Sequence, residues 1–231
     1  MVSGAGRAAV RKNETGEPNA YRKVMNSGIF LERDGLLNLV QVDQQHAIAP
    51  SSLDRFFLKE DAIEPLGQLK RAGFYLIVIT NQPGLSQGWL SRRDLDRMHA
   101  MVQELFPVDD ILVCPHDEND RCPCRKPRTA LFLEAAFKWH LDLEQSFAVS
   151  DKWQDATAAQ NLGCTSLLIK SPWTGLGHHD FILPSLRAVV QKILHLRSIR
   201  QSVLTGELAG GAGATDGAAD SESDQLERLK I

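Results

Sequence analysis

The chain contains a short apolar run that ends in two closely spaced acidic residues and a glycine. The run covers residues 29–31, and Glu32, Asp34 and Gly35 follow it. An apolar run of this length, bounded by polar residues, is typical of a buried strand. Parallel sheets bind ligands at the carboxyl ends of their strands, so we expect Glu32 and Asp34 to lie at such an edge. Two carboxylates there can hold a hard cation and act on a phosphate.

Strand and helix patterns alternate along the middle of the chain. Residues 75–80 form an apolar, β-branched run that is typical of a strand covered on both faces. Residues 61–64 and 91–94 have the form of capping boxes that begin helices, and Gly73 is placed to end the first helix. This alternation predicts an α/β fold with a parallel sheet flanked by helices. The other predicted strands are 29–31, 110–113, 147–150 and 165–169, and the other predicted helices are 129–140, 154–162 and 184–197.

The two ends of the chain differ in composition from this middle part. Residues 1–26 are polar and basic with little periodicity, which predicts a flexible arm. Residues 199–231 contain a glycine- and alanine-rich stretch and then an acidic run. Such a sequence cannot bury enough apolar surface to fold, so we expect a disordered tail. The predicted domain therefore covers residues 27–198, a length that suits a single domain.

Charge and hydropathy exclude several classes of protein. The net charge of −3 argues against a general nucleic-acid-binding protein. The longest apolar run, residues 73–80, is far too short to span a bilayer. The amino-terminal residues have no apolar segment of signal-peptide length. We therefore expect a cytoplasmic protein that has no membrane or nucleic-acid partner.

Residues suited to phosphate chemistry follow four of the predicted strands. Taken singly, such residues are as readily explained as helix caps, turn residues or surface lysines. Their joint order, each group after a predicted strand, is much more specific. In chain order the groups are Glu32 and Asp34, then Thr80 and Asn81, then Lys126, and finally Asp151, Lys152 and Asp155.

These residue types fit the hydrolysis of a phosphate monoester. The substrate is an anion, so a carboxylate needs Mg²⁺ beside it to neutralise charge. The Thr80 hydroxyl and the Lys126 ammonium would bind the other phosphoryl oxygens. A carboxylate nucleophile would form an acyl-phosphate that water then hydrolyses. Asp34 can protonate the leaving alcohol and later deprotonate the water.

A second group of candidate ligands lies between the second and fourth of these strand ends. Cys114, His116, Cys122 and Cys124 fall within eleven residues. Four ligands with this spacing suit a closed, tetrahedral and therefore structural Zn²⁺ site. Such an ion would fold the polar loop 114–124, which is too short to hold itself. The alternative is a set of free thiols beside a surface histidine.

Four segments resemble D-glycero-D-manno-heptose 1,7-bisphosphate phosphatases, a family of the haloacid dehalogenase (HAD) type that is related to histidinol-phosphate phosphatases. The resemblance covers about residues 27–196. It implies a Rossmann-like HAD fold without a large cap domain, an active-site Mg²⁺, a structural Zn²⁺ in a small loop, and removal of one phosphate from a sugar bisphosphate used for lipopolysaccharide heptose. The segments are Phe-Leu-Glu-Arg-Asp-Gly-Leu-Leu-Asn, Val-Ile-Thr-Asn-Gln-Pro-Gly, Cys-Pro-His…Cys-Pro-Cys-Arg-Lys-Pro and Val-Ser-Asp-Lys-x-x-Asp-x-x-Ala-Ala.

The resemblance also implies roles for individual residues. The nucleophile falls on Glu32 and the acid/base on Asp34. Magnesium would be held by Glu32, the backbone carbonyl of Asp34, and Asp151. The expected contacts to phosphate or substrate and the supporting charge fall on Thr80, Asn81, Arg125, Lys126, Lys152 and Asp155.

The chain departs from the family pattern at two positions. Glu32 stands where the family has aspartate, and Ser150 stands where it has glycine. The longer side chain of Glu32 moves the attacking oxygen by on the order of 1 Å, a shift that can cost about 100-fold in rate. Two alternatives therefore stay open: a phosphatase for histidinol phosphate or another small phosphomonoester, and a catalytically silent HAD domain. We expect a monomer in either case.

Overall fold

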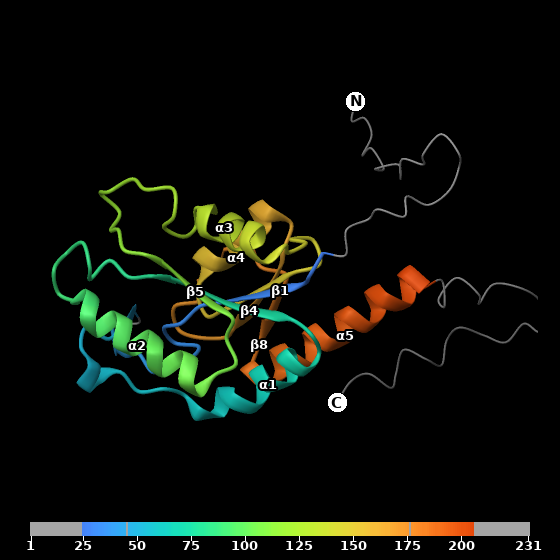
Figure 1. The fold of residues 1–231 in the computed structure, drawn as a ribbon, viewed down its shortest axis with the longest axis horizontal. Coiled ribbons are helices and arrows are strands. Elements are labelled where there is room, and N and C mark those ends of the chain that lie inside the picture. Colours follow the sequence, from blue (N-terminus) through green and yellow to red (C-terminus); the bar gives the residue numbers. More distant parts are fainter. Residues whose placement is uncertain (1–24, 45, 176, 206–231) are drawn as a thin grey trace, which may run out of the picture. The chain divides into compact units, whose positions relative to one another are not determined.

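The computed structural model describes residues 25–44, 46–175 and 177–205. Most of the predicted arm and tail lies outside these residues. The fold is built on a six-stranded sheet in the order β5-β4-β1-β6-β7-β8, in which every neighbouring pair is parallel (Figure 1). The predicted α/β class is therefore confirmed. The strands of this sheet are β1 Gly28–Leu31, β4 Tyr75–Asn81, β5 Asp110–Cys114, β6 Phe147–Ser150, β7 Thr165–Ile169 and β8 Phe181–Leu183.

Helices cover both faces of the sheet, which explains the continuous apolar runs of its central strands. Every residue of β1 and of β6 is buried. Figure 1 shows α3 and α4 over one face and α1 and α2 over the other. With its faces covered, the sheet can receive a ligand at its edge. The bounds of these helices are α1 Ile63–Arg71, α2 Arg92–Leu105, α3 Ala130–Trp139 and α4 Trp153–Leu162.

Of the two predicted capping boxes, the one at 91–94 forms its N-cap hydrogen bond. The Ser91 hydroxyl accepts a hydrogen bond from the backbone N–H of Asp94 at 3.0 Å and begins α2 as predicted. The box at 61–64 is not formed, because a 3-10 helix, η2 (Glu60–Ala62), precedes α1. Ala62, and not Asp61, is therefore the N-cap residue of α1. Gly73 follows the end of α1 with a positive φ of 85°, as its predicted position requires.

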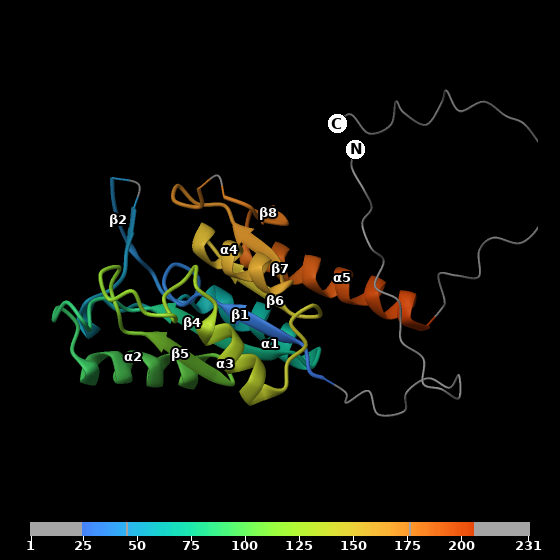
Figure 2. The ribbon, with the colours of Figure 1, turned by 90° about the horizontal axis from the view of Figure 1, so that it is seen from above.

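A small hairpin follows β1 and was not predicted. Its strands, β2 (Gln41–Asp43) and β3 (His46–Ile48), pair antiparallel and project from the main sheet (Figure 2). A 3-10 helix, η1 (Leu53–Arg55), leads from the hairpin toward α1. Strands of three residues that are mostly exposed are too short to show the alternation of apolar and polar residues by which strands are predicted.

The last helix is longer than predicted. α5 runs over Leu186–Thr205 and not only to Arg197, so residues 199–205, which the sequence analysis assigned to the tail, are helical. The chain divides into one compact unit that ends at Gln191 and a second that begins at Lys192. All candidate site residues belong to the first unit. In the described part of the chain, no helix is both long and apolar enough to cross a membrane.

Candidate active site

The carboxyl ends of β1, β4 and β6 bring the predicted residues together. Leu31 pairs with Val78 on one side and with Val149 on the other, so the residues after β1 lie beside the ends of both neighbouring strands. A cavity of about 320 Å³ opens at this edge. The predicted site residues that line it are Glu32, Asp34, Asn81, Arg125, Lys126, Lys152 and Asp155.

A buried lysine joins two carboxylates at the centre of the site. The Lys126 ammonium donates to Glu32 Oε2 at 2.6 Å and to Asp155 Oδ1 at 2.7 Å. All three residues are at most 4% exposed. Its third hydrogen bond goes to the carbonyl of Ile79 at 2.7 Å, so the ammonium group has a partner for each proton. A buried charge needs such full pairing, and the group is therefore held rigidly.

These contacts set the ionisation of the three groups. Burial by itself opposes the charge on Glu32, but Lys126 and Lys152 outweigh it and lower the pKa of Glu32 to about 2. Glu32 is thus ionised at neutral pH, as a carboxylate nucleophile must be. Burial raises the pKa of Asp155 to about 6, against the opposing effect of Lys126. Burial also disfavours the charged form of Lys126, but its two carboxylate partners raise its pKa above the ordinary value.

Asp34 is held by two residues that the sequence analysis did not single out. The Arg33 guanidinium, which is fully buried, donates to both carboxylate oxygens of Asp34 at 2.9 and 3.1 Å. The Gln82 amide donates to Asp34 Oδ2 at 2.6 Å. These contacts fix the orientation of the carboxylate at the wall of the cavity. Both residues could have been selected from the sequence, because Arg33 lies between Glu32 and Asp34 and Gln82 follows directly after the second strand end.

Arg33 itself is supported by two residues that do not line the cavity. Its guanidinium carbon lies 5.4 Å from the centre of the Phe56 ring, and its Nη1 lies 3.1 Å from His99 Nε2. Burial, followed by the charge of Arg33, lowers the pKa of His99 to about 4, so the imidazole is neutral at pH 7. A neutral ring can accept a hydrogen bond from the guanidinium.

Thr80 and Asn81 occupy the predicted strand end, but their polar groups are already engaged. Thr80 is fully buried, does not line the cavity, and its hydroxyl accepts from the Gln82 amide at 2.9 Å. Asn81 accepts from the backbone N–H of Lys126 at 3.1 Å and donates to the carbonyl of Lys126 at 3.3 Å. In this arrangement both residues position their neighbours, Gln82 and Lys126.

Asp151 lies against the loop that carries Asp34. The Trp173 indole donates to its Oδ2 at 2.8 Å, and the Lys152 ammonium donates to its Oδ1 at 2.6 Å. Gly35 has a positive φ of 94°, and a β-carbon built there would come within 2.2 Å of Asp151 Oδ2. A glycine is therefore required for the loop to approach this carboxylate.

Lys152 has a position that its place in the sequence did not reveal. Its ammonium donates not only to Asp151 but also to the backbone carbonyl of Asp34. The side chain is 21% exposed and also lines the cavity. Ser150 supports this turn, because its hydroxyl donates to Asp155 at 2.9 Å and accepts from the backbone N–H of Lys152 at 3.0 Å.

The four cysteine and histidine side chains converge as predicted. Their candidate ligand atoms all lie within 4.8 Å of one another, so the cluster can hold a metal ion. Cys114 Sγ lies 3.3 Å from Cys124 Sγ and 3.6 Å from Cys122 Sγ, and His116 Nδ1 lies 3.3 Å from Cys124 Sγ. Bond lengths to zinc of about 2.1 to 2.3 Å in a tetrahedron give ligand separations of about 3.5 to 3.8 Å. The observed separations are close to these values, and the sulfur atoms are too far apart for a disulfide.

The cysteine–histidine loop leads directly into the cavity wall. Arg125 follows Cys124 in the chain and lines the cavity, and its guanidinium donates to the carbonyl of His116 at 3.2 Å. Lys126 comes next. The fold of this loop therefore sets the backbone positions of Arg125 and Lys126.

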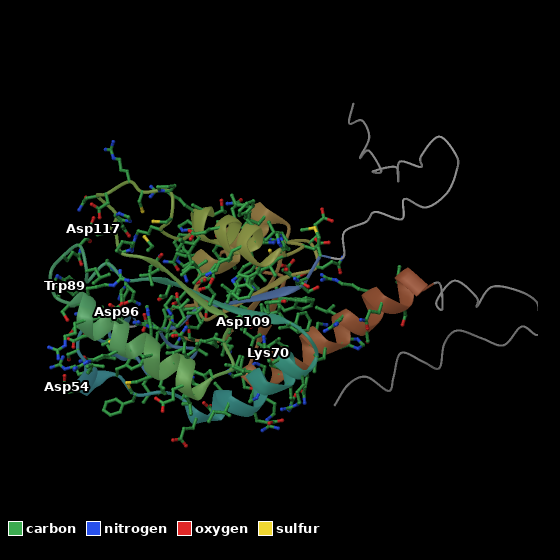
Figure 3. All side chains as sticks on the ribbon, in the orientation of Figure 1. Asp54, Lys70, Trp89, Asp96, Asp109 and Asp117 are labelled. Carbon is green, nitrogen blue, oxygen red and sulfur yellow. The ribbon has the colours of Figure 1, made fainter. Side chains whose placement is uncertain are left out.

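The cavity lining also has an apolar component. Trp89 lines it and is 63% exposed, and the hairpin contributes Ala47 and Ile48. Figure 3 shows Trp89 and Asp117 at the same end of the fold, whereas Lys70 and Asp109 lie toward the other end. The sequence analysis did not select Trp89, because a single tryptophan outside a periodic pattern gives no indication of its surroundings.

Comparisons with known proteins agree with this geometry. The HAD-hydrolase-like family model matches residues 123–188. A D-glycero-beta-D-manno-heptose-1,7-bisphosphate 7-phosphatase of Helicobacter pylori is 34% identical over 64% of this chain and 86% of its own length. The histidine biosynthesis bifunctional protein HisB of Campylobacter jejuni is also 34% identical, over 60% of this chain but only 40% of its own length. The crystal structure of D,D-heptose 1,7-bisphosphate phosphatase from B. bronchiseptica, complexed with magnesium and phosphate, aligns with a TM-score of 0.63 at 27% identity. That alignment covers 74% of this chain and 99% of that one.

The parallel sheet with its edge of carboxylates and lysines defines a hydrolase of the HAD type. Within that class, the sequence identity to the relatives and the share of their length that is covered establish the family. The chain belongs to the phosphatase family that includes the D-glycero-beta-D-manno-heptose-1,7-bisphosphate 7-phosphatases.

Proposed function

We propose that this protein hydrolyses a phosphomonoester of a sugar bisphosphate, with D-glycero-beta-D-manno-heptose 1,7-bisphosphate as its substrate. The observation that carries the proposal is the buried Glu32–Lys126–Asp155 group with Asp34 beside it at the cavity. The relatives named as phosphatases of this substrate support the choice of sugar. We expect the protein to act in the cytoplasm as a monomer, and both remain predictions.

In the proposed mechanism Glu32 is the nucleophile. One of its carboxylate oxygens attacks the phosphorus atom, and the bond from phosphorus to the sugar oxygen breaks. Lys126 holds Glu32 Oε2, and the backbone N–H groups of Arg33 and Asp34 hold Oε1 at 2.7 and 3.3 Å. These contacts orient the carboxylate and balance its charge before the phosphoryl group arrives.

Asp34 is the proposed acid and base. As an acid it gives its proton to the departing sugar oxygen, which leaves Asp34 as a carboxylate. As a base it then takes a proton from the water that attacks the acyl-phosphate on Glu32. The bond from phosphorus to Glu32 breaks, and inorganic phosphate leaves with both carboxyl groups restored to their starting forms. Arg33 and Gln82 hold Asp34 in place for both steps.

The oxygen atoms near Asp34 fit a divalent cation. The backbone carbonyl of Asp34 and the carboxylate of Asp151 already bind a cation, the Lys152 ammonium, and both are hard oxygen ligands of the kind that Mg²⁺ prefers. Together with Glu32 they would hold Mg²⁺. When bound, the ion would neutralise charge on the phosphoryl oxygens.

The cationic residues at the cavity are proposed to bind the substrate. Arg125 and Lys126 line it and carry the charge that a phosphate needs. Thr80 and Asn81 were expected to touch phosphate. Their observed hydrogen bonds support a positioning role, in which Thr80 fixes Gln82 and Asn81 fixes Lys126.

Release of phosphate from heptose 1,7-bisphosphate in the presence of Mg²⁺ tests the proposed function. The natural protein and Glu32→Asp should be assayed side by side, with histidinol phosphate as a competing substrate. We expect both proteins to release phosphate, and the aspartate variant to be as fast or faster, because Lys126 can still pair with a shorter carboxylate. Preference for histidinol phosphate would replace the proposed substrate. Turnover by Glu32→Asp alone would identify the natural chain as a silent member of its family.

We propose further that the cysteine–histidine cluster holds a structural Zn²⁺. The purified protein should contain about one zinc ion per chain, and Cys122→Ser should lose it, because three ligands remain. We also expect the melting temperature of this variant to fall by roughly 5 °C or more. Metal analysis and thermal unfolding measure the two effects.

Cys164→Ser is the matched control for the zinc prediction. Cys164 is also buried, but it is not part of the metal-binding group. Its variant should keep the zinc ion. Equal zinc content in the Cys122→Ser variant and the natural protein would contradict the assignment.

A further inference from the structure

The Lys152 ammonium occupies the place where the proposed Mg²⁺ would bind. It contacts two oxygen atoms, the backbone carbonyl of Asp34 and Asp151 Oδ1, the latter at 2.6 Å. These are two of the three atoms or groups that the proposed function assigns to the metal. Lys152 therefore does not point into solvent, as an ordinary lysine at the start of a helix would.

An ammonium and a magnesium ion cannot share these two oxygens. Magnesium binds oxygen at about 2.0 to 2.1 Å and demands a nearly regular octahedron. An ammonium at hydrogen-bond distance from the same two atoms would take part of that coordination shell. It would also place two positive charges within a few ångströms of each other, where they repel strongly. Occupation by one cation therefore excludes the other.

Lys152 has space into which it can withdraw. Its side chain lines the same cavity of about 320 Å³ that receives the substrate in the proposed function. Its stem has four rotatable carbons, whereas Lys126 is held by three hydrogen bonds in the core. Of these two lysines, Lys152 is the one that can move without leaving a buried cation unpaired.

We propose that the Lys152 ammonium is an internal competitor of the divalent cation for the oxygens of Asp34 and Asp151. It holds these oxygens before metal binds, and Mg²⁺ binds only when Lys152 withdraws toward the cavity. This inference rests on the proposed function for the identity of the metal ligands. Its consequence is an affinity for Mg²⁺ that is weaker than the same oxygen ligands would give without the lysine.

Removal of the ammonium should therefore tighten Mg²⁺ binding. We would titrate the protein as purified, without chelators, with Mg²⁺ by calorimetry in the absence of substrate, and compare it with Lys152→Met. We expect the dissociation constant of the variant to be at least about tenfold lower, because no cation has to be displaced. The rise in melting temperature at a fixed Mg²⁺ concentration should also be larger in the variant.

Lys138→Met is the matched control. Lys138 is more than half exposed and pairs with Asp110 at the amino end of β5, the opposite edge of the sheet. The Lys138→Met variant loses the same charge far from the site, so its affinity for Mg²⁺ should stay within about twofold of the natural value. Lys152→Ser, which also removes the stem, gives a second variant if Lys152→Met does not fold.

Equal dissociation constants for the natural protein and both Lys152 variants would overturn the inference, as would the absence of Mg²⁺ binding in all of them. The titration contains no substrate, so a failure of the proposed phosphatase activity does not affect its outcome. If the protein releases phosphate but its Mg²⁺ affinity is unchanged in the Lys152 variants, only the proposed competition by Lys152 is rejected. Tighter binding in a protein without turnover would support the competition and reject the activity.

Discussion

Asp34→Asn is expected to lower kcat by about 10²- to 10⁴-fold, the range typical for loss of a general acid and base. An amide cannot give a proton to the leaving sugar oxygen or take one from water. The amide oxygen still offers an acceptor to Arg33, whose guanidinium holds the natural carboxylate at 2.9 and 3.1 Å. The fold should therefore persist, but with a lower free energy of unfolding, because the buried Arg33 guanidinium loses its charged partner. Steady-state release of phosphate, together with circular dichroism of the folded variant, measures both parts of the prediction.

The control for this prediction is Asp96→Asn. Asp96 lies on α2 (Figure 3), pairs with Arg92 at 2.8 Å and has a side chain that is 56% exposed. Its loss should leave kcat unchanged, since an exposed pair of this kind contributes little. Natural activity in Asp34→Asn would reject the proposed acid and base.

Lys126→Met is expected to lower the free energy of unfolding by about 3 to 5 kcal/mol and to abolish turnover. Methionine fills a similar volume but leaves Glu32 and Asp155 buried without their shared partner. Removing one member of a buried ionic group is costly because the remaining charges are out of water. Chemical denaturation of the natural protein and the variant measures the difference.

Adding Asp155→Asn to this variant should recover part of the lost stability but no turnover. The second change removes one of the two unpaired carboxylates, while Glu32 still lacks its partner. Lys70→Met is the control, because Lys70 also binds an aspartate, Asp109, at 2.5 Å but has a side chain that is 38% exposed (Figure 3). Its loss should cost about 1 kcal/mol or less. Equal losses in Lys70→Met and Lys126→Met would show that burial of the ammonium does not set its contribution.

The cysteine–histidine loop is joined to the active site by chain order. The loop ends at Cys124, and the next two residues, Arg125 and Lys126, reach the cavity. Asn81 then fixes the backbone of Lys126 through two hydrogen bonds. The proposed metal in the loop and the Asn81 amide at the end of β4 would thus position the same lysine from two sides. A site held in this way is rigid before substrate arrives, which favours catalysis by preorganised charge.

The strands of the central sheet were predictable because burial on both faces leaves a continuous apolar run. Residues 147–150 and 165–169 were predicted as strands and form β6 and β7 with these bounds. The short strands β2, β3 and β8 were missed, because three residues carry too little pattern. The capping box at 61–64 failed for a different reason: the chain enters α1 through a 3-10 turn that leaves no open N-cap for Asp61.

The sequence by itself determined which residues gather at the site. Glu32, Asp34, Lys126 and Asp155 follow successive strands, and parallel pairing brings the carboxyl ends of those strands to one edge. The metal-binding group was equally predictable, because its four ligands are local in the chain and their spacing alone allows them to converge.

Only the tertiary structure decided which partner each side chain takes. Arg33 and Gln82 hold Asp34, Thr80 is buried outside the cavity lining, and Lys152 takes the oxygens of Asp34 and Asp151. These choices depend on strand register and on the direction in which each side chain leaves the backbone, neither of which is encoded by order along the chain. They follow from the requirement that buried charges be paired within the space that the fold provides.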